Sequence, residues 1–257
     1  MDIGTRIARA QLAGLAASRR QIVAGPLTGL LHDHDTWYLS GMVATEPGEP
    51  FDQDAVPEAL AIIRRAFAAE GRWLSAELID EASPGLADVL EANGMTITAR
   101  PPLLVVEPAG LLEPDRADVV ATVVSSDEEQ AEANAVSVEA YESQDAAVGF
   151  EPDPVNGGCI LLRVDGVPVA SASWGAVSDG VTEIAGVSTI HSHRRRGLGA
   201  IATAYATRQA FELAGVTLAW LTPGDDGSER IYRRLGYAPK ATAVHLGDPG
   251  GHLADLR

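Results

Sequence analysis

Hydrophobic residues follow two different spacings along this chain, and together they predict a mixed α/β (α+β) protein. Apolar residues three or four positions apart indicate helices, and short apolar runs bounded by turn residues indicate strands. Helices are predicted over residues 5–23, 54–69, 83–94, 127–142, 199–214 and 227–235. Strands or extended segments are predicted over residues 37–44, 72–79, 95–107, 119–125, 159–164, 167–174, 181–190, 216–221 and 237–246. Helices and strands that alternate in this way form a sheet with helices on its faces.

Two segments interrupt this pattern. Residues 144–158 are rich in Gly, Pro and Asp and are predicted to form a loop. Residues 108–114 begin and end with proline and are predicted to form a linker. A chain of 257 residues is long enough for two domains of ordinary size. We therefore expect two domains, over residues 1–112 and 113–257.

An internal repeat relates these two parts. At an offset of 144 residues, as from Phe67 to Phe211, the matched positions are Val43–Thr45 with Val187–Thr189, Arg64 with Arg208, Ala66 with Ala210, and Gly71 with Gly215. Gly94 matches Gly236 after a shift of two residues. The order of these matches indicates two copies of one strand–helix–strand–helix unit.

The segment Arg194–Ala200 reads Arg-Arg-Arg-Gly-Leu-Gly-Ala and lies between a predicted strand and a predicted helix. The first turn of a helix offers unpaired N–H groups and the positive end of the helix dipole. Gly197 and Gly199 let a ligand approach the backbone closely, and the arginines add charged donors. This combination predicts a site for a pyrophosphate group.

The first copy lacks these features. Its aligned segment, residues 50–55, reads Pro-Phe-Asp-Gln-Asp-Ala, so two carboxylates stand where the second copy has arginines and glycines. Leu90 aligns with Tyr232, so a hydroxyl is missing as well. We expect the first domain to be structural or to form part of a substrate pocket.

The chain is strongly acidic, with a formal net charge of −17. A nucleic-acid-binding protein normally has a basic surface, because phosphate neutralisation supplies most of its affinity. The composition therefore argues against nucleic acid as a partner and makes the three arginines a local site for a small anion. The acidic surface either attracts cationic substrates or serves solubility alone.

A single cysteine, Cys159, excludes a disulfide within the chain and fits a cytoplasmic protein. It stands beside an apolar run, so a buried structural thiol is favoured over a nucleophile. We expect no signal peptide and no membrane span, because no apolar stretch has the required length or position. No group of Cys and His has the spacing of a metal site.

The C-terminal part resembles the GNAT superfamily of acyl-CoA-dependent N-acyltransferases. The resemblance rests on two motifs within residues 119–246: Arg194-x-x-Gly197-x-Gly199 after an apolar strand, and Tyr232-x-x-x-Gly236-Tyr237 one helix and one strand later. It implies a mixed, mostly antiparallel sheet flanked by helices, in two tandem related domains. Residues 1–112 would form a degenerate domain, and residues 113–257 the catalytic acetyltransferase domain.

The resemblance also implies that acetyl-CoA binds as co-substrate. The loop that holds its pyrophosphate would consist of Arg194, Arg195, Arg196, Gly197, Leu198, Gly199 and Ala200. The backbone of Val187, Ser188 and Thr189 would pair with the pantetheine arm and polarise the thioester carbonyl. Asp225 stands where the family often has Asn and is a further candidate contact to CoA, while His191 stands where the family often has Pro.

Acyl transfer to an amine requires an acid for the departing thiolate and a base for the amine proton. Tyr232 occupies the position of the usual general acid, and its alternative role is that of a packed helix aromatic. Glu183 is the candidate base, and its alternative is an exposed carboxylate at a strand edge. Other candidates are Glu142, Asp145 and Glu151 for the base or for amine recognition, His191 and His193 as solvent-exposed or CoA-adjacent groups, and Trp174 as a pocket wall or core residue.

Three classes of function remain to be compared. The leading hypothesis is an N-acetyltransferase that acts on a primary amine of a small molecule or peptide, and the alternative is a non-catalytic acyl-CoA-binding or regulatory protein. Retention of Tyr232 in the second copy favours catalysis. Walker and Rossmann nucleotide binding are not supported, because the loop has neither the Walker lysine nor the Gly-x-Gly-x-x-Gly pattern. The acceptor amine and the oligomeric state do not follow from the sequence.

Overall fold

The computed structural model of the chain describes residues 1–34, 36–114, 116–147 and 157–249. The chain forms two compact units. The first unit consists of Met1–Leu103 with Pro239–Arg257, and the second unit consists of Leu104–Ala238.

The first unit is built on a sheet in the order β1-β2-β3-β4-β12, and β5 also pairs with β12. Its strands are β1 (Arg20–Ala24), β2 (Leu27–Leu31), β3 (Gly41–Ala44), β4 (Ser75–Ile79), β5 (Thr96–Ala99) and β12 (Ala238–Gly247). Its helices are α1 (Ile3–Ala17), α2 (Val56–Ala69) and α3 (Leu86–Ala92). Leu60, Ile63 and Phe67 recur at helical spacing on α2 and are buried in the core of this unit, because the apolar stripe of the helix faces the sheet.

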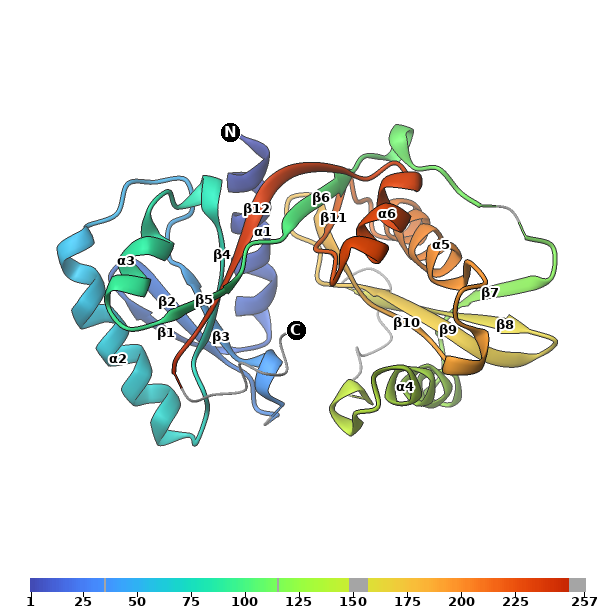
Figure 1. Cartoon of the computed structure of the whole chain (residues 1–257), viewed down its shortest axis with the longest axis horizontal. Helices are drawn as coiled ribbons and strands as arrows, with labels where there is room; N and C mark the ends of the chain where they lie inside the picture. The colour runs from blue at the N-terminus through green and yellow to red at the C-terminus, as the bar shows by residue number, and fades with distance from the viewer. Residues whose placement is uncertain (35, 115, 148–156, 250–257) are drawn as a thin grey trace. The chain divides into compact units, whose positions relative to one another are not determined.

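The second unit has a sheet in the order β6-β11-β10-β9-β8-β7. Its strands are β6 (Pro102–Val106), β7 (Val119–Val123), β8 (Gly158–Val164), β9 (Val167–Trp174), β10 (Val181–Thr189) and β11 (Leu218–Leu221). Its helices are α4 (Asp127–Tyr141), α5 (Leu198–Leu213) and α6 (Asp226–Arg234). Figure 1 shows α4 and α5 on opposite sides of strands β8 to β10, so this part of the sheet is covered on both faces.

Short 3-10 turns connect several of these elements. They are η1 (Trp37–Leu39), η2 (Gln53–Ala55), η3 (Asp80–Ala82), η4 (Pro108–Gly110), η5 (Gln144–Ala147) and η6 (His191–His193). The predicted fold class, a mixed and mostly antiparallel sheet flanked by helices, is confirmed, because only the pairs β3–β4 and β10–β11 among the described strand pairs are parallel.

The repeat is visible in the topology. In each unit one helix joins two parallel strands: α2 joins β3 to β4, and α5 joins β10 to β11. The matched glycines also share a left-handed backbone, with φ of 66° at Gly71 and 65° at Gly215, and of 90° at Gly94 and 94° at Gly236. Such φ values suit glycine because it has no Cβ. The two copies therefore agree in turn geometry as well as in sequence.

The last strand of each unit comes from the other half of the sequence. β6 follows the helices of the first copy, yet Leu104–Val106 pair with β11 in the second unit. β12 ends the second copy, yet Ala243–Gly247 pair with β4 in the first unit. The expected division at Leu112 assigned β6 to the first domain and residues 237–246 to the second, and the compact units differ from it in both strands. A hydrophobic run identifies a strand but not the sheet edge that it joins.

Three predicted elements differ most from the structure in their limits. The helix expected over residues 5–23 ends at Ala17, and residues 20–24 instead form β1, which pairs with the unpredicted β2. The strand expected over residues 37–44 begins at Gly41, after a 3-10 turn. The extended segment 95–107 is two strands, separated at Arg100 and Pro101. The N-terminal error arose because Ile22 continues a helical spacing into a strand.

Candidate active site

A β-bulge in β10 opens the sheet of the second unit. β10 pairs in parallel with β11 only at Val181–Glu183, whereas its pairing with β9 continues to Thr189. The register to β9 shifts between Ala185 and Ser188, and Gly186 has φ of 60°. A bulge bends a strand away from its neighbour. On the β11 side, the backbone of residues 187–189 therefore has no partner among the described strands.

The segment Arg194–Ala200 lies directly after this open strand and begins α5. Arg195 and Gly197 have left-handed backbones, with φ of 62° and 79°, and successive turns of this kind make N–H groups converge on an anion. No described side chain caps the start of α5, so its first N–H groups remain available to a ligand. No described atom lies within 4 Å of the point where a Cβ on Gly197 would stand.

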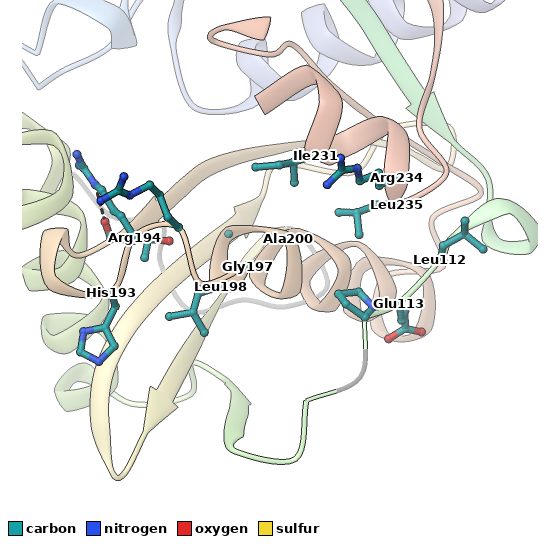
Figure 2. Close-up of a pocket in the computed structure, with 14 residues that line it drawn as sticks. Leu112, Glu113, His193, Arg194, Gly197, Leu198, Ala200, Ile231, Arg234 and Leu235 are labelled. Carbon is teal, nitrogen blue, oxygen red and sulfur yellow. Dashed lines mark hydrogen bonds between the residues drawn. The ribbon is translucent and has the colours of Figure 1, made fainter. Parts of the chain in front are cut away.

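This helix start borders a pocket of about 490 Å³, named here the loop pocket (Figure 2). Its walls are Leu112–Pro114, Thr189, His193–Arg195, Gly197–Ala200, Ile231, Arg234 and Leu235. The structure thus brings most of the predicted pyrophosphate loop, including Arg194, Arg195, Gly197, Leu198, Gly199 and Ala200, to one cavity. Arg196 does not line either of the two pockets described in this unit, and its carbonyl accepts a hydrogen bond from Arg116 instead (2.6 Å).

The predicted linker forms a wall of the loop pocket. The Leu112 N–H donates to the Leu235 carbonyl (2.9 Å), and the Glu113 carboxylate lies 2.9 Å from the Arg208 guanidinium. A Cβ on Gly236 would stand 1.9 Å from the Gly110 carbonyl oxygen, so only glycine permits this close approach. This wall could not be predicted, because a short segment bounded by prolines resembles any connector in the sequence.

A second pocket, of about 240 Å³, adjoins the first and is named here the tyrosine pocket. It is lined by Ala140, Tyr141, Val187, Ser188, Thr189, Arg194, Gly199, Ser228, Ile231 and Tyr232. Thr189, Arg194, Gly199 and Ile231 line both pockets. The open strand of β10, the start of α5 and Tyr232 therefore border one continuous surface.

Tyr232 is half-buried on α6, and burial raises its pKa to about 12, with further contributions from nearby Tyr141 and Asp225. The Tyr237 N–H donates to the Tyr232 carbonyl (3.1 Å), as the Met95 N–H does to Leu90 in the first unit. The alignment of Tyr232 with Leu90 therefore holds in the structure. At neutral pH the phenol is therefore protonated and can donate a hydrogen bond.

Asp225 serves the helix rather than either pocket. Its carboxylate accepts from the Ser228 N–H (2.6 Å), and the Ser228 hydroxyl completes a capping box at the start of α6. These hydrogen bonds lower the pKa of Asp225. Neither described pocket has Asp225 in its lining, and a contact to CoA at this position stays a prediction.

Glu183 stands near the start of β10, opposite Trp220 of β11. Regular strand alternation would place Glu183 on the same face as Val187, but the bulge between Ala185 and Ser188 interrupts that alternation. As far as the described residues go, Glu183 lines neither pocket.

The other candidate side chains fall into distinct positions. Glu142 lies 3.0 Å from His191, whereas His193 lines the loop pocket. Trp174 is fully buried and is therefore a core residue. Burial raises the pKa of the Cys159 thiol, in agreement with a structural role. Asp145 lies in η5, and Glu151 lies outside the described residues.

The Ser188 side chain has a role that the sequence did not suggest. It is buried, and its hydroxyl lies 2.7 Å from that of Ser171 on β9 and 3.4 Å from that of Ser137 on α4. Its hydroxyl therefore binds its neighbours across the sheet, although Ser188 is also among the residues that line the tyrosine pocket.

Within the described ranges there is no cluster of three His, Cys, Asp or Glu side chains that could hold a metal ion. None of the described helices combines the length and hydrophobicity needed to cross a membrane.

Comparison with known proteins agrees with this geometry. Residues 123–237, which carry β10, the start of α5 and α6, match the Acetyltransferase (GNAT) family. A solved structure described as a GCN5-related N-acetyltransferase from Kribbella flavida is 68% identical, with 100% of both chains covered and a TM-score of 0.92. No curated protein sequence matches the chain.

Two more distant structures share the fold. One is a functionally unknown conserved protein from Staphylococcus epidermidis, with 17% identity, 94% of this chain and 98% of that chain covered, and a TM-score of 0.64. The other is a tandem GNAT protein from the clavulanic acid biosynthesis pathway, with 16% identity, 88% and 78% covered, and a TM-score of 0.62. The family match over the site and the full-length relative lead to one conclusion: the chain belongs to the GNAT superfamily of N-acetyltransferases.

Proposed function

We propose that this protein transfers an acetyl group from acetyl-CoA to a primary amine of a small molecule or peptide. The observation that carries the proposal is the adjacency of the loop pocket and the tyrosine pocket around Thr189 and Gly199. An anion-binding helix start and a protonated phenol thereby border one surface, as a cofactor with a pyrophosphate at one end and a thioester at the other requires.

In this proposal the start of α5 binds the pyrophosphate. The N–H groups of the first helical turn and the arginines of Arg194–Ala200 supply donors and positive charge. The rest of the chain is acidic, so this local charge is what selects an anion. The open edge of β10 would receive the amide-bearing arm of CoA, because an unpaired strand edge offers alternating N–H and C=O groups.

The reaction requires one bond to form and one to break. The amine nitrogen attacks the thioester carbon, the oxyanion is stabilised by the N–H groups that Val187 and Thr189 direct to the open edge, and the C–S bond then breaks. A phenol with a pKa of about 12 is a weaker acid than a thiol of pKa ~8.5, so Tyr232 acts mainly by hydrogen bonding to the departing sulfur. A phenol that gives its proton to the sulfur regains one from solvent. Glu183, acting through water, is the proposed acceptor of the amine proton.

A panel of amines tests this function. Amino acids, polyamines, aminoglycosides and peptide N-termini are incubated with acetyl-CoA, and free thiol is measured. We expect at least one amine to release thiol well above the rate of hydrolysis, and acetyl-CoA at 100 times its Kd to stabilise the fold by about 2.7 kcal/mol. No stabilisation by millimolar acetyl-CoA would overturn the cofactor assignment. Stabilisation without thiol release from any amine would favour a non-catalytic binding protein.

A further inference from the structure

The open edge of β10 exposes two of its carbonyl groups toward the tyrosine pocket. The Ile190 N–H donates to the Val169 carbonyl on the β9 side (3.0 Å), so the backbone of Ser188, two residues earlier, faces the same way. Val187 and Thr189 therefore direct their N–H and C=O groups to the opposite, open edge. This edge is where a peptide-like ligand could add to the sheet.

Both of these carbonyls are occupied by side chains. The Tyr141 hydroxyl donates to the Val187 carbonyl (2.9 Å), and the Arg194 Nε donates to the Thr189 carbonyl (3.2 Å). Arg194 also donates to the Ala140 carbonyl at the end of α4. We call Tyr141 and Arg194 the clasp, because together they hold the end of α4 on the open edge.

The two residues of the clasp differ in how many hydrogen bonds hold them. Glu142, the C-cap residue of α4, lies 3.0 Å from His191 and fixes the end of the helix beside the loop. Arg194 is held by two carbonyls, but Tyr141 has one hydrogen bond to the edge, and its side chain is 53% exposed. Tyr141 can therefore leave the edge without opening the core.

We propose that the Tyr141 hydroxyl competes with the amide-bearing arm of the acyl donor for the Val187 carbonyl. An arm with an amide N–H would donate to the same oxygen that the Tyr141 hydroxyl now uses. Entry of the arm then moves the Tyr141 hydroxyl off the strand, within the pocket that also contains Tyr232. This inference rests on the function proposed above, because it assumes a donor that binds along β10.

The test compares two ligands on Tyr141→Phe. CoA carries the arm, whereas 3′-phosphoadenosine 5′-diphosphate is its nucleotide part alone, and both are titrated by calorimetry. Loss of one competing hydrogen bond should tighten CoA binding about fivefold and leave the nucleotide unaffected. Tyr205→Phe is the matched control, because Tyr205 contacts Arg208 on α5 and lines neither described pocket.

The outcomes separate this inference from the proposed function. Wild type that binds CoA, together with a Tyr141→Phe variant that binds it equally or more weakly, would overturn the competition and leave the function standing. Wild type that binds neither ligand would overturn the function and the inference with it. If both variants unfold at the same temperature as the wild type, a change in CoA affinity is not caused by loss of the fold.

Discussion

The two copies within this chain have the same helix in the same place, but the helices begin in opposite ways. α2 begins after η2, where Asp52 caps the Asp54 N–H (3.0 Å) and Glu58 lies in the first turn. α5 begins at Gly197 with no described side-chain cap and no acid in its first turn. No described side chain caps α2 itself, but the first copy places carboxylates in the turn before the helix and in its first turn, where they would repel an anion. The second copy has no acid in the first turn of its helix, so this start is open to an anion.

The preceding strands differ as well. β3 keeps an unbroken register to β2 from Gly41 to Ala44, whereas β10 has a bulge between Ala185 and Ser188. Farther along, Leu90 is fully buried, but its counterpart Tyr232 borders a pocket. Three local changes on one scaffold thus separate a packed copy from a copy with a site. The comparison supports the proposal that the first unit is structural.

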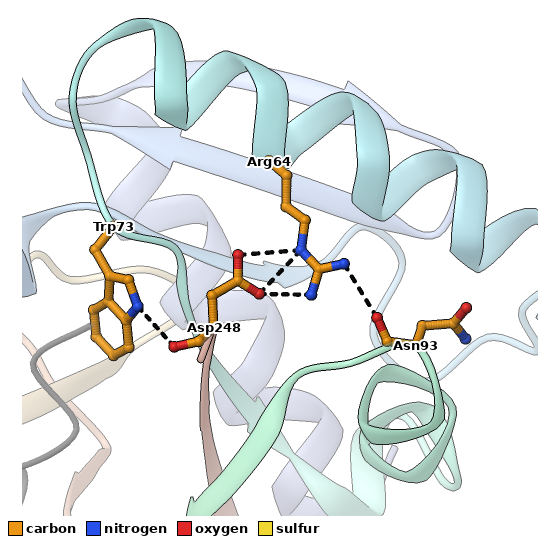
Figure 3. A network of polar contacts seen from close by, with 4 residues as sticks. All are labelled: Arg64, Trp73, Asn93 and Asp248. Atoms are coloured by element: carbon orange, nitrogen blue, oxygen red, sulfur yellow. Dashed lines mark hydrogen bonds and ion pairs between the residues drawn. The ribbon is translucent and has the colours of Figure 1, made fainter. Parts of the chain in front are cut away.

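One pair of repeated residues keeps a shared role. Arg64 of α2 binds Asp248, directly after β12, through Nε (3.0 Å) and a terminal nitrogen (2.6 Å), and also binds the Asn93 carbonyl (Figure 3). Its counterpart Arg208 of α5 binds Glu113, in the segment after β6. In each unit the same arginine holds the chain that follows the strand supplied by the other half of the sequence.

The largest effect is expected from a substitution that gives the start of α5 a carboxylate, as the start of α2 has. Gly197→Glu places a carboxylate and a side chain in the proposed pyrophosphate site, and like-charge contact costs several kcal/mol, so acetyl-CoA affinity should fall about 10³-fold. Binding is measured by calorimetry. Gly215→Glu is the control, since its φ of 65° imposes similar strain with no described atom within 4 Å of its Cβ. Equal affinity in the Gly197 variant would refute the role of the loop.

A smaller effect is expected from an apolar residue at position 232, the counterpart of Leu90 in the second copy. Tyr232→Phe removes only the hydroxyl, so kcat for the best amine should fall about 100-fold while the Kd of acetyl-CoA stays unchanged. Thiol release and calorimetry give the two values. Retention of full turnover would show that the Tyr232 hydroxyl does not assist the departing sulfur, and a matching loss of affinity would indicate a binding role instead.

The two arginines sharpen the comparison further. Arg208→Gln frees Glu113 and loosens a wall of the loop pocket, so CoA affinity should fall about fivefold.

Arg64→Gln should instead lower the free energy of unfolding by about 2 kcal/mol with CoA affinity unchanged, because its partner lies in the first unit.

Denaturant unfolding and CoA titration of both arginine variants give the two readouts. Arg65→Gln is the control, since Arg65 is the exposed neighbour of Arg64 on the same helix. A loss of CoA affinity in Arg64→Gln equal to that in Arg208→Gln would contradict the separate roles.

The smallest effect concerns alkaline stability. Burial raises the pKa of Tyr232 to about 12 in the folded protein, against ~10 for a free tyrosine, so the unfolded chain loses this proton first. The stability associated with Tyr232 is therefore full below pH ~10 and declines as the pH rises toward 12. Thermal unfolding across this range should show a shallower decline for Tyr232→Phe than for wild type. Parallel curves for the two proteins would show that the phenol does not retain its proton on folding.

Much of the site could be predicted, because its chemistry lies in contiguous residues. Arg194–Ala200 and Tyr232 carry their roles in a local motif, and the structure places them around adjoining pockets. The bulge at Gly186, the wall formed by Leu112–Pro114 and the hydroxyl of Tyr141 on Val187 could not be predicted. Each depends on a contact between distant segments, which neither hydrophobic period nor motif spacing encodes.

The exchanged strands limit which fragments of this protein can fold alone. Expressed alone, residues 113–257 would lack β6 at the edge of β11 and would carry β12 away from its partner β4. The missing β6 and the unpaired β12 each leave an open sheet edge, and open edges promote aggregation. Deletion of the first copy is therefore expected to destabilise the second, although the proposed site lies in the second. Each copy supplies a strand that the sheet of the other requires, so neither copy is a self-contained folding unit.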